Sequence, residues 1–395
     1  MLTCEIDIMV NMNQYEALPS PCFVMYEEAL EANLQLLDLV QREADVSIIC
    51  ALKGFAFWHS FPMVKAYLSG ATASSLNEAR LIVEEMNCEA HTFAPVYLEE
   101  EIDSLMLYSS HLTFNSLSQF EKYKNRRDKY KKRVSFGLRV NPEYSEIETD
   151  LYNPALPGSR LGVLAEQMPE QLPPEIEGLH FHVLCENDSY ALERCLQHFE
   201  ARFAPWIKQC KWVNFGGGHH ITRADYDVAH LIELLQNFRK RYPNIEEVIL
   251  EPGEAVGWQT GVLVSTVEDI VENKGVNIAM LNISFACHLP DCLEMPYKPT
   301  VLSAHEPNEN SKFVYRLGGC SCLAGDYIGM GDFAFDEPLE VGDRIVFDDM
   351  IHYTMVKTTF FNGVKHPAIG VVKPDGEFLL LSEPGSFQDY KSKLG

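Results

Sequence analysis

Eight short apolar segments alternate with helical segments between about residue 45 and residue 255. The apolar segments have the length and composition of β-strands, and segments such as 77–86 and 191–208 have helical periodicity. A strand, helix, strand order that repeats eight times predicts a parallel (β/α)8 barrel, which is an α/β fold. The expected strands span residues 47–53, 71–75, 91–96, 112–116, 135–141, 178–183, 211–217 and 246–251.

Two further segments belong with the expected barrel. A helix over residues 27–43 is predicted to precede its first strand. The Pro-rich segment 142–177 is too long for a simple crossover, so we expect a loop excursion there. Together these features predict a barrel domain over residues 22–257.

The chain changes in character after about residue 258. Runs such as Gly261–Val267 and Gly342–Phe347 are short, β-rich and separated by turn residues. This pattern is typical of an antiparallel sheet. We therefore expect a second, mainly antiparallel β domain over residues 258–395, which also includes residues 1–21.

The composition limits the classes of function. The chain has 395 residues and a formal net charge of −25. This charge opposes binding to nucleic acid and attracts cationic small molecules. The alternative interpretation is that the charge serves only to keep the protein soluble. No apolar run reaches the length of a membrane span, and the first twenty residues lack the pattern of a secretory signal. The eleven cysteines form no small disulfide framework, which favours a reducing, cytoplasmic location.

Chemically useful residues follow the ends of the expected strands. In a (β/α)8 barrel, catalytic residues cluster at the carboxyl ends of the strands. We therefore expect one active site at this end of the barrel. The residues concerned are Lys53 on the first strand, Arg139 and Asn141 on the fifth, His182 on the sixth, Gly216, Gly217 and Gly218 on the seventh, and Glu251 on the eighth.

These residue types match the needs of pyridoxal phosphate (PLP). Burial at a strand end disfavours the charged form of Lys53, and a neutral amine can form a Schiff base with an aldehyde cofactor. Backbone N–H groups of the three glycines can approach a phosphate, Glu251 can keep the pyridine nitrogen protonated, and His182 can stack on the ring. Taken alone, each residue has a structural alternative as a surface lysine, a turn, a cap or a core histidine.

A metal site is the alternative for the histidines. His180 and His182 lie two residues apart on one expected strand, and a catalytic metal can use such a pair. Further ligands would be expected at later strand ends, where Glu251 is a poor candidate. Cys320 and Cys322 form another possible pair, but no second cysteine pair has zinc-like spacing. We therefore expect no metal.

Two groups of residues in the β domain have possible catalytic chemistry. Cys322 and Asp326 place a thiol and a carboxylate in one glycine-containing loop, and Tyr353 supplies a phenol. Taken separately, these residues look structural, since a buried tyrosine usually finds a partner for its hydroxyl.

Seven segments together carry a resemblance to a known family. They are Ala51–Ala56, Phe181–Glu186, Asn214–His219, Glu251–Ala255, His288–Tyr297, Ser321–Asp326 and Met350–Gly363. The chain resembles the alanine-racemase-fold (fold type III) PLP decarboxylases, which include ornithine and diaminopimelate decarboxylases. Within this family it is most similar to the carboxynorspermidine and carboxyspermidine group.

The resemblance implies cofactor roles for the barrel residues. Lys53 would carry PLP as a Schiff base, with His182 stacked on the ring and Glu251 at the pyridine nitrogen. The glycines 216–218 would bind the phosphate together with Tyr353.

The resemblance also implies a homodimer with shared active sites. Cys322 and Asp326 would enter the active site of the other subunit of a head-to-tail dimer. There Cys322 would be the proton donor after carbon dioxide leaves, and Asp326 a substrate contact. Arg139 would support the lysine region together with Glu78.

The chain departs from the ornithine-type relatives at two positions. Glu254 stands where they place a phosphate-binding arginine, and Cys185 where they place a serine. We therefore expect a small, cationic, polyamine-like substrate, bound by Glu254, His288 and Asp291 with Asp326. The expected reaction converts carboxynorspermidine and carboxyspermidine to norspermidine and spermidine. The alternatives are another fold-III enzyme, acting on diaminopimelate, ornithine or arginine or racemising an amino acid, and a non-catalytic homologue.

Overall fold

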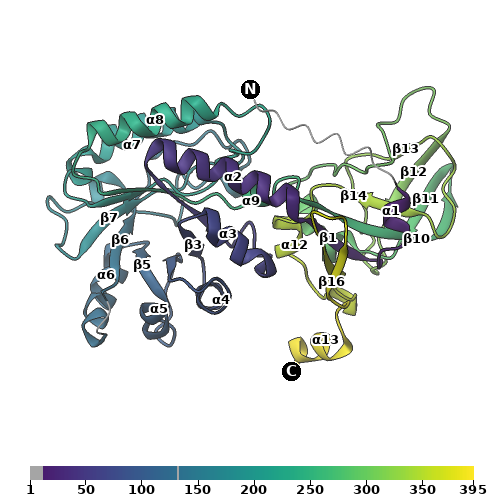
Figure 1. The fold of residues 1–395 in the computed structure, drawn as a ribbon, viewed down its shortest axis with the longest axis horizontal. Coiled ribbons are helices and arrows are strands. Elements are labelled where there is room, and N and C mark those ends of the chain that lie inside the picture. Colours follow the sequence, from purple (N-terminus) through teal and green to yellow (C-terminus); the bar gives the residue numbers. More distant parts are fainter. Residues whose placement is uncertain (1–11, 131–132) are drawn as a thin grey trace. The chain divides into compact units, whose positions relative to one another are not determined.

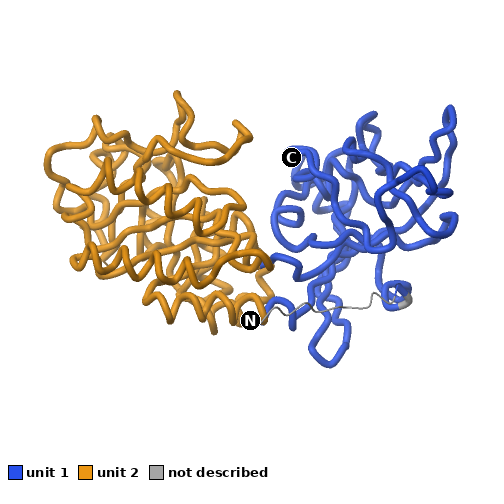
Figure 2. Tube along the Cα trace, turned by 90° about the horizontal axis from the view of Figure 1, so that it is seen from above, with its two compact units in different colours: residues 1–31, 257–395 blue, residues 32–256 orange. Residues whose placement is uncertain are grey.

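The computed structural model describes residues 12–130 and 133–395. The chain forms two compact units, one of residues 32–256 and one that combines residues up to 31 with residues 257–395 (Figure 2). We expected the barrel to begin at residue 22. Instead, strand β1 (Cys22–Tyr26) pairs with strands of the second unit, because its apolar residues continue that unit's sheet. Residues 1–11, which we assigned to the β domain, lie outside the described residues.

The first unit is a closed barrel of eight parallel strands, which confirms the predicted fold. Each observed strand overlaps an expected one, but several end two or three residues earlier than predicted. The candidate residues therefore lie in the turns just beyond the strands. The strands are β2 (Ser47–Ala51), β3 (Gly70–Ala73), β4 (Ala90–Phe93), β5 (Ser109–Phe114), β6 (Ser135–Arg139), β7 (Ile176–His180), β8 (Trp212–Asn214) and β9 (Glu247–Leu250).

Helices follow most of the barrel strands, and Figure 1 shows α7 and α8 lying side by side. Side chains of Ser75, Ser116, Asp188 and Asp227 accept backbone N–H groups at four helix starts, which fixes where these helices begin. The helices are α2 (Glu27–Ala44), α3 (Phe61–Tyr67), α4 (Leu76–Leu81), α5 (Ile102–Tyr108), α6 (Leu117–Tyr123), α7 (Ser189–Ile207), α8 (Val228–Arg241) and α9 (Glu254–Gly257).

The segment between β6 and β7 is the predicted loop excursion. It contains only two short 3-10 turns, Asp150–Tyr152 and Ala165–Gln167. The Asn141 side chain donates to the carbonyls of Pro154 and Leu161, so this residue holds the loop.

Aromatic side chains pack together inside the barrel near the amino ends of its strands. A Cβ atom at Gly137 or Gly178 would come within 2.3 or 2.0 Å of the Trp212 ring, so only glycine leaves room for this indole. The Trp212 Nε1–H donates to Ser135, and the His111 ring packs edge-on against the indole. These aromatic side chains thus lie inside the barrel at the end opposite to the candidate site.

The second unit is a sheet in the order β13-β12-β11-β10-β1-β15-β16, with β14 paired to β10. The pairings are antiparallel except β1 with β15 and β11 with β12, so the predicted, mainly antiparallel domain is confirmed. Its strands after β1 are β10 (Gly261–Asn273), β11 (Val276–Leu281), β12 (Phe313–Gly318), β13 (Phe333–Phe335), β14 (Arg344–Phe347), β15 (Ala368–Val372) and β16 (Phe378–Ser382).

Short helices complete the second unit. They are α1 (Asn13–Glu16), α10 (Phe285–His288), α11 (Pro290–Glu294), α12 (Tyr353–Val356) and α13 (Phe387–Leu394). Across the described residues of both units, no helix has the length and apolar character needed to cross a bilayer.

Candidate active site

Lys53 lies in a tight turn beyond the end of β2. The N–H groups of Gly54 and Phe55 both donate to the carbonyl of Ala51, and Gly54 packs against Gly253 so closely that a Cβ would meet it at 3.0 Å. Leu52 and Gly54 are buried, but Lys53 is exposed. The expectation of a buried strand-end lysine is therefore wrong, because the strand ends at Ala51 and Lys53 lies in the turn beyond it, where its side chain is exposed.

The charge of Lys53 acts on three other groups of the barrel. Burial raises the pKa of Glu78, while the N–H of Ser74 and the positive charge of Lys53 oppose this rise. Burial lowers the pKa of His182 and the same lysine charge adds to this effect, whereas at Glu251 burial raises the pKa and the lysine charge opposes the rise. Lys53 is thus electrostatically coupled to the residues at the other strand ends.

Glu251 is a buried carboxyl, 7% exposed, at the end of β9. Its Oε1 accepts the Nδ2–H of Asn214 at 2.7 Å, and the Oδ1 of Asn214 accepts the N–H of Gly216 at 2.8 Å. Burial raises the pKa of Glu251, opposed by hydrogen bonds from Asn214 and Thr72 and by the charges of Arg139 and Lys53. This carboxyl would therefore gain from any further cation beside it.

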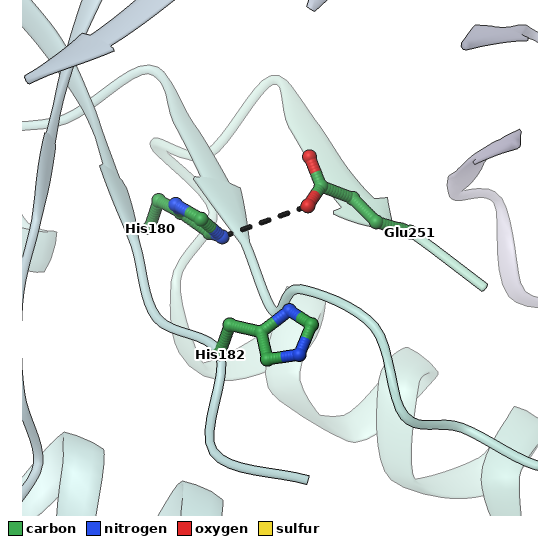
Figure 3. A group of neighbouring side chains, drawn as sticks. All are labelled: His180, His182 and Glu251. Carbon is green, nitrogen blue, oxygen red and sulfur yellow. Dashed lines mark ion pairs between the residues drawn. The ribbon is translucent and has the colours of Figure 1, made fainter. Parts of the chain in front are cut away.

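His180 and His182 lie beside Glu251, and Figure 3 shows the three side chains together. The Nε2 of His180 is 3.6 Å from Oε2 of Glu251. The Nδ1 of His182 accepts the N–H of Gly217 at 3.0 Å. Burial lowers the pKa of both histidines well below the usual value, and the charge of Arg139 adds to this effect, so both rings are neutral at pH 7.

The glycine turn after β8 is tightly enclosed. Gly216 and Gly218 have φ angles of +69° and +83°, and a Cβ at Gly217 would come within 2.4 Å of the Glu251 carbonyl. The N–H groups of Gly216 and Gly217 donate to Asn214 and His182. These two N–H groups therefore serve the protein itself, contrary to the expectation that they would bind a phosphate.

Arg139 joins this cluster from β6. Its Nη2 donates to the carbonyl of His182 at 3.1 Å, and its guanidinium lies 4.6 Å from the Phe93 ring centroid. Burial lowers its pKa to about 10, against the attraction of Glu251. Arg139 thus acts on Glu251, whereas Glu78, its expected acidic partner, is coupled to Lys53.

His180, His182 and Glu251 also bear on the alternative hypothesis of a metal site. Ligand atoms of His180, His182 and Glu251 lie within 4.8 Å of one another, so Glu251 does meet the histidine pair. However, the Nδ1 of His182 already accepts a hydrogen bond, and the charges of Arg139 and Lys53 both act on this cluster. Two neighbouring cations and an occupied imidazole nitrogen favour an acid–base cluster over a dication site.

In the second unit, Asp326 is buried, with 4% of its surface exposed. Three donors of its own unit enclose the carboxylate at 3.0–3.1 Å, namely Ser284 Oγ, Ala286 N and Ser321 N. A Cβ at Gly319 would collide with this carboxylate at 2.3 Å. Asp326 therefore holds the loop from Gly319 onward to the start of α10.

Cys322 is exposed at the tip of this loop, where its N–H donates to Asn362 Oδ1 at 3.0 Å. Tyr353 is half-buried at the start of α12, and the Nζ of Lys357 lies 5.9 Å from its ring centroid. Of these two side chains, the thiol is thus the more accessible.

The expected substrate-binding residues differ in accessibility. His288 is fully buried, its Nδ1 accepts Ser284 N–H, and its Nε2 bonds the Lys365 carbonyl, so a substrate-binding role does not fit it. Asp291 is paired with Lys357 at 2.6 Å. Glu254 is half-buried at the start of α9, next to the turn of Lys53.

Sequence reasoning missed two residues of the barrel site. Asn214 connects Glu251 to the glycine turn, and Thr72 on β3 also hydrogen-bonds Glu251. Asn214 had a visible signal, a polar residue at the end of an apolar strand. Thr72 had none, since threonine is common in strands.

A family model described as "Pyridoxal-dependent decarboxylase, C-terminal sheet domain" matches residues 22–351. The chain belongs to the pyridoxal-dependent decarboxylases. It is therefore a PLP-dependent carboxy-lyase, as the sequence predicted.

Similar proteins cover nearly the whole chain. A protein of Synechocystis sp. named carboxyaminopropylagmatine decarboxylase is 48% identical over 100% of both chains. A Campylobacter jejuni protein named carboxynorspermidine/carboxyspermidine decarboxylase is 45% identical over 95% of this chain and 98% of its own. The crystal structure of carboxynorspermidine decarboxylase from C. jejuni, complexed with norspermidine, has a TM-score of 0.86 and 43% identity, covering 95% of this chain and 100% of that chain.

The barrel residues fit the cofactor that defines this family. Lys53 supplies an accessible amine, and Glu251 a buried carboxyl that gains from a cation. The ring of His182 is neutral, and the glycine turn leaves no room for side chains. An amine, a carboxyl and a flat ring are the groups that PLP requires for its aldehyde, pyridine nitrogen and ring face.

Proposed function

We propose that this enzyme decarboxylates carboxynorspermidine and carboxyspermidine, releasing norspermidine and spermidine for polyamine biosynthesis. The observation that carries the proposal is the likeness, across 95% of this chain, to the C. jejuni enzyme that binds norspermidine. The net charge of −25 supports it, because an acidic protein attracts a polycationic substrate over long range.

The barrel residues would bind and tune the cofactor. PLP supplies an electron-accepting ring for the electron pair that remains when carbon dioxide departs. Lys53 would hold the cofactor at its aldehyde group through the side-chain amine. Glu251 would hold a proton at the pyridine nitrogen, and the neutral His182 ring would cover the ring face. Because Gly216 and Gly217 donate within the protein, the phosphate would use donors beyond them, with Tyr353.

The second unit would supply the returning proton. Cys322 is exposed on a loop that Asp326 holds in place, so its thiol can act outside its own unit. We propose a homodimer in which this loop completes the barrel site of the other subunit, with Cys322 donating a proton to the α-carbon. The described cysteines are free, in keeping with a reducing, cytoplasmic location.

Two acidic residues would bind the cationic tail of the substrate. Glu254 lies beside the turn of Lys53. Asp291 already forms an ion pair with Lys357, which a substrate ammonium can replace. A carboxylate paired with a flexible lysine side chain is suited to such an exchange, because one cation replaces another.

Carboxyaminopropylagmatine is the second candidate substrate. The Synechocystis relative named for it is 48% identical over the whole chain, slightly more than the C. jejuni relative. Its tail would end in a guanidinium in place of an ammonium, which changes the hydrogen-bonding geometry at the distal end.

A substrate panel tests these proposals. Carbon dioxide release is followed with carboxynorspermidine, carboxyspermidine, carboxyaminopropylagmatine, diaminopimelate, ornithine and arginine, at matched concentrations and with added PLP. We expect kcat/KM to be highest for the first two. A preference for the guanidinium substrate would replace the first proposal by the second, and a preference for the amino acids would overturn both.

A further inference from the structure

His180 is a buried polar side chain that the proposed function does not use. It is 2% exposed, and neither ring nitrogen has a hydrogen-bond partner in the described chain. An unsatisfied polar group in a protein interior costs about 1–3 kcal/mol. The neighbours of this ring therefore indicate what offsets the cost.

Two neighbours hold the His180 ring in its place. The Phe93 ring packs edge-on against it at 5.3 Å and 70°, and Phe93 also contacts the Arg139 guanidinium. Arg139 disfavours a second positive charge on the imidazole. The ring is thus confined and uncharged, with one nitrogen left to face an acceptor.

The acceptor is the oxygen of Glu251 that Asn214 leaves open. Asn214 donates to Oε1, whereas Oε2 lies 3.6 Å from the Nε2 of His180 (Figure 3). This distance is longer than a hydrogen bond, and the two atoms would form one on closer approach. The groups of the other packed elements that act on Glu251 are Thr72, Arg139 and Lys53.

We infer that His180 is a positioning residue whose neutral Nε2–H favours the anionic form of Glu251 and fixes its orientation toward the cofactor nitrogen. A neutral donor suits this task, because a cation at the same place would cancel the negative charge that the pyridine nitrogen requires. The inference rests on the proposed role of Glu251 toward PLP.

Two substitutions distinguish the packing of the His180 ring from the hydrogen-bond donor that the ring carries. His180→Phe keeps an aromatic ring against Phe93 and removes the donor. His180→Gln restores an N–H at a similar reach. The matched control is His111→Phe, a histidine at the opposite end of the barrel that also packs against an aromatic ring.

The first readout uses the full-length, cofactor-free protein. The infrared carbonyl band of protonated Glu251, assigned by its loss in Glu251→Gln, is titrated with acid in each variant. Removing a donor that stabilises the anion raises the pKa of the carboxyl, so we expect the titration to move up by about one pH unit in His180→Phe. His180→Gln and His111→Phe are expected to titrate like the unsubstituted protein.

The second readout uses the holoenzyme. We expect PLP affinity to fall about tenfold in His180→Phe, with the acidic limb of the kcat/KM profile moved to higher pH, and both to recover in His180→Gln. An unchanged titration of Glu251 in His180→Phe would overturn the inference, and so would equal shifts in the Phe and Gln variants.

Two further measurements keep these outcomes distinct. If His180→Phe fails to fold by circular dichroism, His180→Leu takes its place with the same expected shift. A Glu251→Gln enzyme that binds PLP and turns over normally would instead remove the proposed role of Glu251, without altering the infrared result.

Discussion

Glu251 and Asp326 are both buried carboxyls, yet they differ in what surrounds them. Glu251 accepts hydrogen bonds from Asn214 and Thr72, with a neutral histidine near Oε2 and two cationic side chains acting on it. Asp326 is enclosed by donors from its own loop and from the adjoining residues 284–286. The difference teaches that burial alone does not identify a ligand-binding acid. The two carboxyls differ in the charge of their surroundings, since Arg139 and Lys53 act on Glu251 whereas neutral N–H and O–H donors hold Asp326.

The contrast between Glu251 and Asp326 would be lost if the cluster around Glu251 were not the cofactor site. We expect Lys53→Ala to lose the visible absorbance band of bound PLP and to lower turnover by roughly 10⁴-fold or more, since no other amine takes its place. Absorbance spectra and carbon dioxide release measure both effects. Lys122→Ala, on the exposed face of α6, is the control and should retain both. Normal turnover of the Lys53 variant would exclude the barrel site.

A smaller effect tests the loop that Asp326 holds. Cys322→Ala should slow turnover by about 10²–10⁴-fold, because a positioned proton donor is lost, and should alter where the product is protonated. Product analysis in heavy water detects this change. Cys320→Ala is the matched control, since Cys320 is also an exposed cysteine of this loop and has no role in the proposal. Equal loss in both variants would point to loop damage.

The two carboxyls can be compared directly through their amides. Asp326→Asn turns an NH2 group toward a backbone or hydroxyl donor, so hydrogen-exchange protection in residues 319–326 should fall about 30-fold, near 2 kcal/mol. Asp336→Asn, at an exposed acid, should leave protection unchanged. Glu251→Gln should lower the free energy of local unfolding around residue 251 by less than about 1 kcal/mol, because burial already disfavours the charged form of Glu251. Equal losses at both sites would remove the distinction between them.

The smallest effect is a pH dependence in the second unit. Burial lowers the pKa of His288 from 6.5 to about 4, so the folded state binds its proton less readily than the unfolded state. The contribution of His288 to the free energy of unfolding is fully present above pH 6.5. It is lost as the pH falls toward 4, by about 1 kcal/mol per pH unit. Urea unfolding at pH 7 and pH 5.5 measures the change, and His288→Gln should flatten it. An equal acid sensitivity in that variant would assign the effect to other groups.

The barrel and its active end could be predicted because strand and helix periods alternate so regularly. The sequence also predicted that Lys53, His182 and Glu251 would lie at one end of the barrel, because a parallel barrel gathers its strand ends. The exposure of Lys53 was missed, since the strand stops at a turn that sequence pattern alone does not resolve. His288 bonds the carbonyl of Lys365 and Asp291 pairs with Lys357, and both partners lie more than sixty residues away along the chain. Such contacts depend on tertiary packing and are not visible in the sequence. Both residues were therefore predicted to bind substrate, and in the structure only Asp291 remains suitable for that role.

The indole of Trp212 requires glycine at positions 137 and 178, because a Cβ at either position would collide with the ring. The three positions are therefore interdependent. A methyl group at residue 137 or 178 fits only when residue 212 carries a smaller side chain, so the free-energy cost of one substitution depends on which residue occupies the other position.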